Sequence, residues 1–311
     1  MKFRILTILF IVFTYNSCRN DIGISSKYIT QRVVIVVVDG PRYQETWNYK
    51  NRSFISNRNE LSKEGVLFTN FKNTGITLTN PGHTSIVTGV NQNINNAGAQ
   101  LPDQPSIFQY YLKEKGLPNS ACQIIASKDK LAVLSNCLNL TYKNKFMPEY
   151  NCGISGLNSG YREDKETFKV ALQTLANKHP NLVLIQFKEP DASGHANDWR
   201  GYVNGIQKTD EYIGLIWKYL QEDSYYFGKT SLFVTNDHGR HDDNVSNGFV
   251  NHGDNCNGCR HIELLAIGPD FSKGKVISNS YNQTDLASTI GTILGFKSYY
   301  SQGKTIQELL K

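Results

Sequence analysis

The sequence predicts an α/β fold, a three-layer α/β/α sandwich around a mainly parallel central sheet. Two observations carry this prediction. First, several short segments are continuously apolar and rich in β-branched residues, which is typical of strands covered on both faces; they are 32–38, 122–126, 182–187, 231–235 and 264–267. Second, segments with helical periodicity lie between and after them, at 107–115, 165–177, 203–220, 286–294 and 306–310. Alternating strands and helices favour a parallel sheet with helices on both faces.

Composition excludes several classes of protein. The chain has 311 residues, of which 39% are hydrophobic, and its formal net charge is +6. Lys and Arg are spread without blocks, so the sequence does not predict a nucleic acid duplex as a partner. Six cysteines are too few for a small disulfide-stapled fold. We find no internal repeat or linker, and we predict one catalytic domain over residues 31–311.

The first residues are typical of an export signal. Lys2 and Arg4 precede an apolar stretch at 5–13, which is too short to span a bilayer as a helix. Ser17-Cys18 resembles a bacterial lipoprotein processing site, although Tyr15 departs from the strict pattern, and ordinary cleavage is the alternative. We therefore predict a signal peptide over 1–17, a tether over 18–30, and a lipid on Cys18 that anchors the exported protein in the periplasm or at the cell surface.

Five further cysteines follow Cys18, two of them in Cys256-Asn257-Gly258-Cys259. This pair is compatible with half of a zinc knuckle or with a tight-loop disulfide. We favour the disulfide, because no second closely spaced pair completes a four-cysteine zinc site. The pairing of the other cysteines does not follow from their positions.

Acidic residues and histidines follow three of the predicted strands. Asp39 ends the first, Asp191 and His195 follow the strand at 182–187, and Asp237-His238 follows the strand at 231–235. In open α/β sheets ligands bind at the carboxyl ends of the strands. A single Asp after a strand is usually a turn or cap residue, but three such sites, two with a His, favour a Zn²⁺ site or one for a similar divalent ion.

Thr79 precedes a helix-compatible segment at 85–90. It is compatible with an ordinary N-cap. The functional interpretation uses the same geometry, because backbone N–H groups at a helix N-terminus favour an anion, and a metal lowers the pKa of a hydroxyl.

Five short motifs together resemble the alkaline phosphatase superfamily, particularly its nucleotide pyrophosphatase/phosphodiesterase-like and Thr-nucleophile phosphatase branches. They are V-V-V-D-G at 36–40, T-N-P-G-H at 79–83, P-D-A-S-G-H at 190–195, N-D-H-G at 236–239 and N-H-G-D at 251–254. Each motif is weak alone, but all five occur in the order of the family. The resemblance implies two Zn²⁺ ions or similar divalent ions and a Thr79 phospho-enzyme intermediate.

The resemblance also implies which side chains bind each ion. One ion would be bound by Asp191, His195 and His252, and the other by Asp39, Asp237, His238 and the Thr79 oxygen. His241 and His261 compete with His252 for the last place, and the N-H-G-D context favours His252.

The class of ester depends on a second group of residues. The superfamily's sulfatases need a Cys or Ser within C/S-x-P-x-R, which Thr79-Asn80-Pro81-Gly82-His83 does not provide. Ser127-Lys128-Asp129-Lys130 resembles the S-K-D-R run of the Thr-nucleophile phosphomonoesterases, in which Lys and Arg contact phosphate oxygens. Lys130 replaces Arg and loses its bidentate fork. The alternative for Lys128 and Lys130 is a solvated loop.

The sequence thus predicts an exported di-metal phosphohydrolase, a phosphomonoesterase that acts on a small phosphorylated substrate. The alternatives within the superfamily are a phosphodiesterase or nucleotide pyrophosphatase and a phosphonoacetate hydrolase. From another class, the chain could be a non-catalytic lipoprotein that binds ligands at the cell surface. Fold alone does not decide among them.

Overall fold

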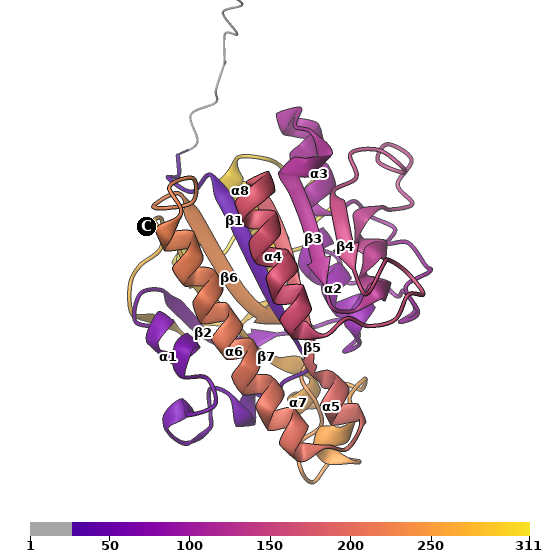
Figure 1. Cartoon of the computed structure of the whole chain (residues 1–311), viewed down its shortest axis with the longest axis vertical. Coiled ribbons are helices and arrows are strands. Elements are labelled where there is room, and N and C mark those ends of the chain that lie inside the picture. The colour runs from indigo at the N-terminus through magenta and orange to yellow at the C-terminus, as the bar shows by residue number, and fades with distance from the viewer. Residues whose placement is uncertain (1–26) are drawn as a thin grey trace, which may run out of the picture.

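A mixed sheet runs through the centre of the protein (Figure 1). The computed structural model describes residues 27–311, so the predicted signal peptide, Cys18 and most of the predicted tether lie outside the described residues. The strand order is β4-β3-β5-β1-β6-β7-β2-β8, with β9 also paired to β2. The central strands are β1 (Arg32–Asp39), β5 (Leu182–Pro190) and β6 (Thr230–Asn236), and β1 pairs with both neighbours in parallel.

The remaining strands extend the sheet on both sides. On one side, β3 (Cys122–Ala126) and β4 (Glu149–Cys152) continue the parallel part. On the other, β7 (His261–Ile267) is antiparallel to both β6 and β2 (Val66–Lys72). Two short strands, β8 (Lys275–Ile277) and β9 (Tyr281–Asn282), pair with β2 in parallel. The predicted α/β fold with a mainly parallel sheet is therefore confirmed.

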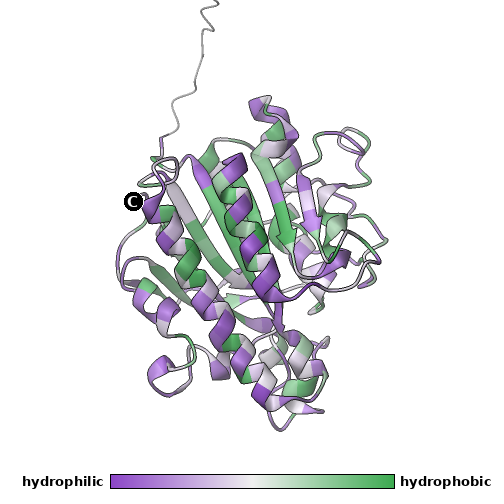
Figure 2. Ribbon diagram, in the orientation of Figure 1, coloured by the Kyte–Doolittle hydropathy of each residue, from purple (hydrophilic) through white to green (hydrophobic). Residues whose placement is uncertain are grey.

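Helices cover both faces of the central sheet, and as a result every residue of β1 is buried. Val34, Val36 and Val38 pack in the core beneath α4 (Asp164–Lys178) and α6 (Trp199–Glu222), while the alternate residues pack towards α2 (Thr79–Thr88), α3 (Ile107–Lys115) and α8 (Thr284–Leu294). Figure 2 shows the hydrophobic strands at the centre and polar residues along α4 and α6. Three short helices are α1 (Ser56–Leu61), α5 (Asp191–His195) and α7 (Asn257–Arg260).

Some boundaries differ from the prediction. The helix predicted at 306–310 is wrong: the segment forms one 3-10 turn at Gln307–Leu309, and Leu310 forms a bridge with Phe271. The end of the predicted tether is already attached to the body, because the Ile29 and Thr30 amides donate to the Asp270 carboxylate at 2.9 and 2.8 Å. Among the described residues, none of the helices is long and apolar enough to cross a membrane.

Candidate metal centre and nucleophile

The sheet topology brings the predicted acidic residues together. Strands β5, β1 and β6 are adjacent and parallel, so their carboxyl ends lie on one edge of the sheet. Asp39 is the last residue of β1, and a register shift there places it opposite Pro190, so that Asp191 follows at once. Asp237 and His238 follow β6 on the other side. The common edge predicted from the strand ends is thus formed.

Three buried ligand atoms meet beside β1 and β6. His238 Nε2 lies 3.5 Å from Asp39 Oδ1 and 3.3 Å from Asp237 Oδ2. All three atoms are buried, and none has a hydrogen-bond partner within the described part of the chain. Unpaired buried polar atoms are costly and rare. Two carboxylate oxygens and one imidazole nitrogen in this arrangement fit a divalent cation.

A second set of ligand atoms lies around Asp191. Its Oδ1 lies 3.4 Å from His195 Nε2 and 3.3 Å from His252 Nε2, and the two imidazole nitrogens are 3.0 Å apart. His252 Nδ1 faces the Thr77 carbonyl oxygen at 2.8 Å, which orients its ring so that Nε2 points to Asp191. Two imidazoles and a carboxylate aimed at one point also fit a divalent cation.

The two competing histidines lie elsewhere. The His261 ring stacks on Tyr43 with centroids 3.9 Å apart, and its Nε2 faces the Thr69 carbonyl oxygen. His241 pairs with Asp254 at 3.2 Å. By contrast, the His252 ring stacks on His238 at 3.7 Å, which places it between the two groups of ligand atoms. The geometry therefore groups His252 with Asp191, as the motif predicts.

Thr79 is the first residue of α2 and is buried. Its carbonyl oxygen lies 2.8 Å from His83 Nδ1 in the next turn of the helix, which fixes the start of α2. The helix approaches the end of β6 closely, because a Cβ on Gly82 would lie 2.5 Å from the Asp237 carbonyl oxygen. Gly82 therefore lets the helix bring Thr79 close to the acidic residues.

Lys128 contacts both Thr79 and the two groups of candidate ligands. Its Nζ lies 2.8 Å from Asp39 Oδ2, 2.6 Å from Asp191 Oδ2 and 3.2 Å from Thr79 Oγ1. Only 2% of the residue is exposed, so the solvated-loop interpretation is wrong for Lys128. Burial alone would disfavour the ammonium, but the Asp191 and Asp39 carboxylates raise the pKa of Lys128, which stays protonated.

Lys130 is also buried, with 8% exposed, so the solvated-loop interpretation fails here too. Burial, followed by the charge of Lys128, lowers the pKa of Lys130 to about 8. Its backbone carbonyl accepts a hydrogen bond from the Asn80 side chain at 3.4 Å, beside Thr79. Lys128 and Lys130 therefore both lie beside Thr79 and its neighbour Asn80.

The protonation of the candidate ligands suits a cation. Burial lowers the pKa of His238 to about 3 and the pKa of His195 to about 4, so both imidazoles are neutral at pH 7. Burial and the neighbouring Asp237 carboxylate raise the pKa of Asp39 well above its usual value. Close carboxylates repel one another, and a cation between them would remove that repulsion.

Two side chains at the site were not predicted. Arg240 donates to the Asp191 carboxylate and, at 2.8 Å, to the Val250 carbonyl oxygen. Gly40, at φ +66°, leaves the space for this pair, because its Cβ would lie 2.9 Å from Asp191 Oδ1. Gln186 Nε2 donates to Asp39 Oδ2 at 2.9 Å. Gln186 could have been found as the one polar residue within the apolar run 182–187.

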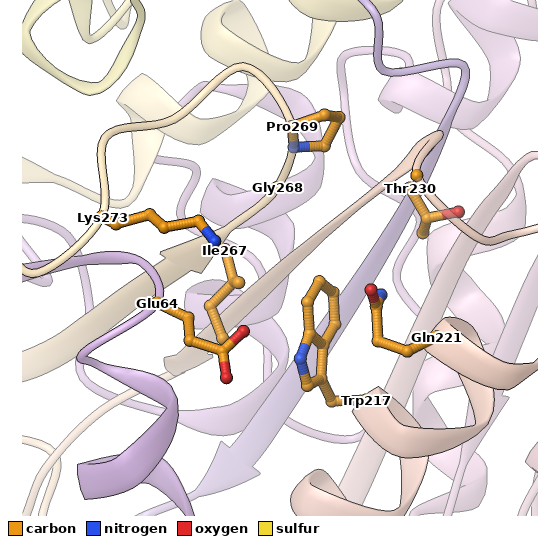
Figure 3. A pocket seen from close by; sticks show the side chains of 9 residues that line it. Glu64, Trp217, Gln221, Thr230, Ile267, Gly268, Pro269 and Lys273 are labelled. Carbon is orange, nitrogen blue, oxygen red and sulfur yellow. The ribbon is translucent and has the colours of Figure 1, made fainter.

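A cavity of about 150 Å³ is formed by other residues (Figure 3). It is lined by Trp217, Thr230 and Ile267 among others. Thr230 begins β6, whereas the site follows Asn236 at its other end. The cavity is therefore at the opposite edge of the sheet, away from the candidate metal ligands.

The fold and this site define the class of protein. A family model for the Metalloenzyme superfamily matches residues 31–261, and the chain belongs to that superfamily, the alkaline-phosphatase-like hydrolases. The superfamily predicted from the five motifs is confirmed.

Among individual proteins, the chain is 25% identical over 247 residues to bis(5'-adenosyl)-triphosphatase from Xenopus laevis, which covers 75% of this chain and 52% of that protein. The chain thus spans about half the length of this relative. Murine ectonucleotide pyrophosphatase/phosphodiesterase 5, as an inactive Thr-to-Ala variant in complex with AMP, superposes with a TM-score of 0.64 at 18% identity, over 90% of this chain and all of that chain. The phosphonate monoester hydrolase of Silicibacter pomeroyi gives a TM-score of 0.64 at 15% identity, over 90% and 76% of the two chains. These superpositions support the fold.

Proposed function

We propose that the protein is a phosphomonoesterase that uses two divalent metal ions, Zn²⁺ or similar, and Thr79 as its nucleophile. The observation that carries the proposal is the contact between Lys128 Nζ and Thr79 Oγ1, at 3.2 Å, beside both groups of ligand atoms. A buried ammonium at the nucleophile is suited to an anionic substrate group.

The two ions would be bound by the residues already grouped by geometry. One set is Asp191, His195 and His252, and the other is Asp39, Asp237 and His238. His238 Nε2 also lies within 4.8 Å of ligand atoms of Asp191 and His252, so the two sets adjoin one another. The family resemblance adds the Thr79 oxygen to the second set. When bound, such ions would lower the pKa of the Thr79 hydroxyl and offset charge on the transferring phosphoryl group. His195 and His238, which are neutral at pH 7, and the unpaired oxygens of Asp39 and Asp237 are ready to bind them without releasing protons from these two imidazoles.

The residues of the chain define the reaction. Thr79 Oγ attacks phosphorus, a bond forms between Oγ and phosphorus, and the bond from phosphorus to the ester oxygen breaks in line with it. The hydroxyl proton of Thr79 passes to solvent, and the ester oxygen leaves as an alcohol after it takes up a proton from solvent. Water then hydrolyses the phosphothreonine and releases phosphate. Lys128 is a donor throughout and not a base, because the adjacent carboxylates keep it protonated. A threonine-to-alanine substitution inactivates the structurally similar murine protein.

Selectivity for monoesters would come from charge. The terminal phosphate of a monoester carries more anionic oxygen than a diester. Lys128 lies at the nucleophile, and the positive end of α2 points to the same place. Lys128 would thus contact an anionic oxygen of a monoester. In a diester that position is occupied by the second alkoxy group, which is uncharged.

A second candidate, a phosphodiesterase or nucleotide pyrophosphatase, is favoured by the relatives. The similar Xenopus protein is a bis(5'-adenosyl)-triphosphatase, and the murine protein binds AMP. The same nucleophile and metal ligands would serve this reaction. The two candidate functions differ in the group that Lys128 would contact: an anionic phosphate oxygen in a phosphomonoesterase, and the second ester group in a phosphodiesterase.

The test compares p-nitrophenyl phosphate with bis-p-nitrophenyl phosphate on protein loaded with zinc. We expect kcat/KM for the monoester to be at least about ten times that for the diester. A tenfold ratio corresponds to about 1.4 kcal/mol of additional transition-state binding. A ratio that favours the diester would replace the first candidate by the second.

We also propose that the protein is exported and held at a membrane by a lipid on Cys18. The support is the sequence alone: two basic residues, an apolar segment at 5–13 and Ser17-Cys18. Expressed from the full gene in a bacterium, the wild-type protein should partition into detergent, whereas Cys18→Ala should not. Wild-type protein that remains in the aqueous phase would contradict the lipid anchor.

A further inference from the structure

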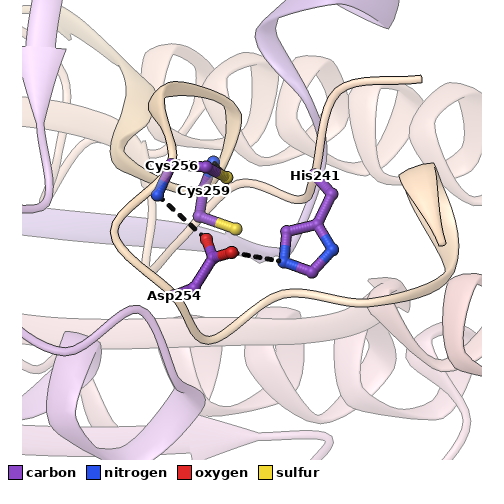
Figure 4. A group of neighbouring side chains, drawn as sticks. All are labelled: His241, Asp254, Cys256 and Cys259. Carbon is purple, nitrogen blue, oxygen red and sulfur yellow. Dashed lines mark hydrogen bonds and ion pairs between the residues drawn. The ribbon is translucent and has the colours of Figure 1, made fainter. Parts of the chain in front are cut away.

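A second group of metal-binding side chains lies outside the candidate active site. His241, Asp254, Cys256 and Cys259 converge on one point (Figure 4), and one ligand atom from each lies within 4.8 Å of all the others. The disulfide predicted for Cys256 and Cys259 is wrong, because both cysteines are free in the structure. None of the four side chains belongs to the two groups around Asp39 and Asp191.

His241 provides a separate indication of a missing ligand. The residue is only 5% exposed, and among residues 27–311 neither ring nitrogen has a hydrogen-bond partner of proper geometry. Its Nε2 instead faces the Asp254 carboxylate at 3.2 Å. A buried imidazole without a hydrogen bond is costly. A ligand between His241, Asp254 and the two sulfur atoms would remove this cost.

We propose that these four side chains bind one structural Zn²⁺, in addition to the two ions of the active site. Two thiolates, one imidazole and one carboxylate are a donor set that Zn²⁺ prefers, and four protein ligands complete a closed tetrahedral site. With Zn–S bonds of about 2.3 Å, tetrahedral sulfur atoms lie about 3.8 Å apart. All four ligand atoms already lie within 4.8 Å of one another, and His241 Nε2 is 3.2 Å from Asp254 Oδ2, so the widest pairs need to close by at most about an ångström. Asp254 is exposed and provides the route of entry.

The surrounding backbone shows what the ion would stabilise. The Gly239 amide donates to the Cys259 carbonyl oxygen at 2.8 Å, and the His241 amide donates to the Asn251 carbonyl oxygen at 3.1 Å. The Asp254 carbonyl oxygen accepts from the Thr77 hydroxyl at 2.7 Å. The proposed ion would thus join the segment after β6 to the loop that carries His252, and would position that loop without contacting the substrate.

Cobalt gives a test that separates this site from the active site. Co²⁺ bound by thiolate shows a sulfur-to-metal charge-transfer band, and the active-site groups contain only oxygen and nitrogen donors. Titration of reduced, metal-free full-length protein with Co²⁺ should produce this band, and its final intensity should correspond to one thiolate-bound ion per chain once all sites are filled. The double variant Cys256→Ser/Cys259→Ser should lose it, and the control Cys122→Ala/Cys152→Ala, at two other buried cysteines, should keep it.

Two further readouts do not depend on activity, and the second uses only the wild-type protein, so it does not depend on the folding of a variant. The zinc content of the wild-type protein should exceed that of the double variant by one ion per chain, whatever the active site binds. In the wild-type protein, zinc should protect Cys256 and Cys259 from alkylation. The proposal is overturned if the wild type shows no thiolate band, if the band survives in the double variant, or if the protein exported by cells carries a Cys256–Cys259 disulfide.

Discussion

The two candidate metal centres are built in opposite ways. All of the candidate active-site ligands except Thr79 and His252 end or follow the neighbouring strands β5, β1 and β6, which bring them together from distant parts of the sequence. The four side chains of the proposed structural site all lie between His241 and Cys259. The first centre depends on the buried sheet, whereas the second depends on one loop. We infer that the sheet holds Asp39, Asp191, Asp237 and His238 in place before metal binds, and that the loop, which also carries His252, is stabilised by its own ion.

The largest expected effect concerns the nucleophile. Thr79→Ala should reduce kcat by at least about a thousandfold, because no other hydroxyl replaces the attacking oxygen. Metal content should fall little, because the carboxylates and imidazoles remain and are held by the sheet. Steady-state kinetics together with metal analysis checks both points. The control is Thr292→Ala, in α8. Unchanged turnover in the Thr79 variant would refute the assignment.

The next effect concerns selectivity. Lys128→Met should lower kcat/KM for p-nitrophenyl phosphate by roughly a hundredfold to a thousandfold, which is typical for loss of one preorganised donor to a developing charge. The bis-ester should lose much less, so the ratio between the two substrates should fall. Lys208→Met, at an exposed lysine on α6, is the matched control. An equal loss for both substrates would show that Lys128 does not select monoesters.

A smaller effect is expected for the residue that supports Asp191. Arg240→Gln should weaken metal binding by roughly 10–100-fold, as is usual when a partner that orients a metal ligand is lost. Competition with a chelator measures this affinity, and Arg200→Gln, at an exposed arginine, is the control. Wild-type affinity in the Arg240 variant would mean that Asp191 is held by its strand alone.

The smallest expected effect is a change in hydrogen exchange, and it compares the two candidate metal centres directly. Chelation of metal should increase hydrogen exchange in the loop at 241–259 and leave β1, β5 and β6 protected, because those strands are buried on both faces. The comparison should be made in Thr79→Ala, so that substrate and product play no part. Equal loss of protection in the sheet and in the loop would contradict the inferred difference between them.

The sheet could be predicted because its strands are buried on both faces. The segment 122–126 was predicted to the residue, since a short continuous apolar run leaves few alternatives. Strand β2 was missed because only part of it is buried, and its pattern, Val-Leu-Phe-Thr-Asn-Phe-Lys, changes character halfway. The helix predicted at 306–310 has too few residues for more than the one turn that forms.

Only some of the candidate site residues could be predicted, because the others are defined by contacts between distant parts of the sequence. Asp39, Asp191 and Asp237 could be placed together from strand ends alone, because parallel strands end on one edge. Lys128 is buried against the carboxylates of Asp39 and Asp191, which lie far from it in the sequence, and no local pattern shows that contact. Arg240 is likewise defined by its partner Asp191 and by a glycine that leaves room for it. The cysteine pair could not be assigned without knowing that His241 and Asp254 lie beside it.

The most direct measurement of the central claim is to trap the phospho-enzyme. Zinc-loaded protein is mixed with p-nitrophenyl phosphate, quenched in acid within one turnover, digested and analysed by mass spectrometry. We predict one phosphoryl group on the peptide that contains Thr79, and none in Thr79→Ala treated in the same way. Turnover without a phosphorylated peptide, or a phosphoryl group on another residue, would contradict a mechanism in which Thr79 attacks phosphorus.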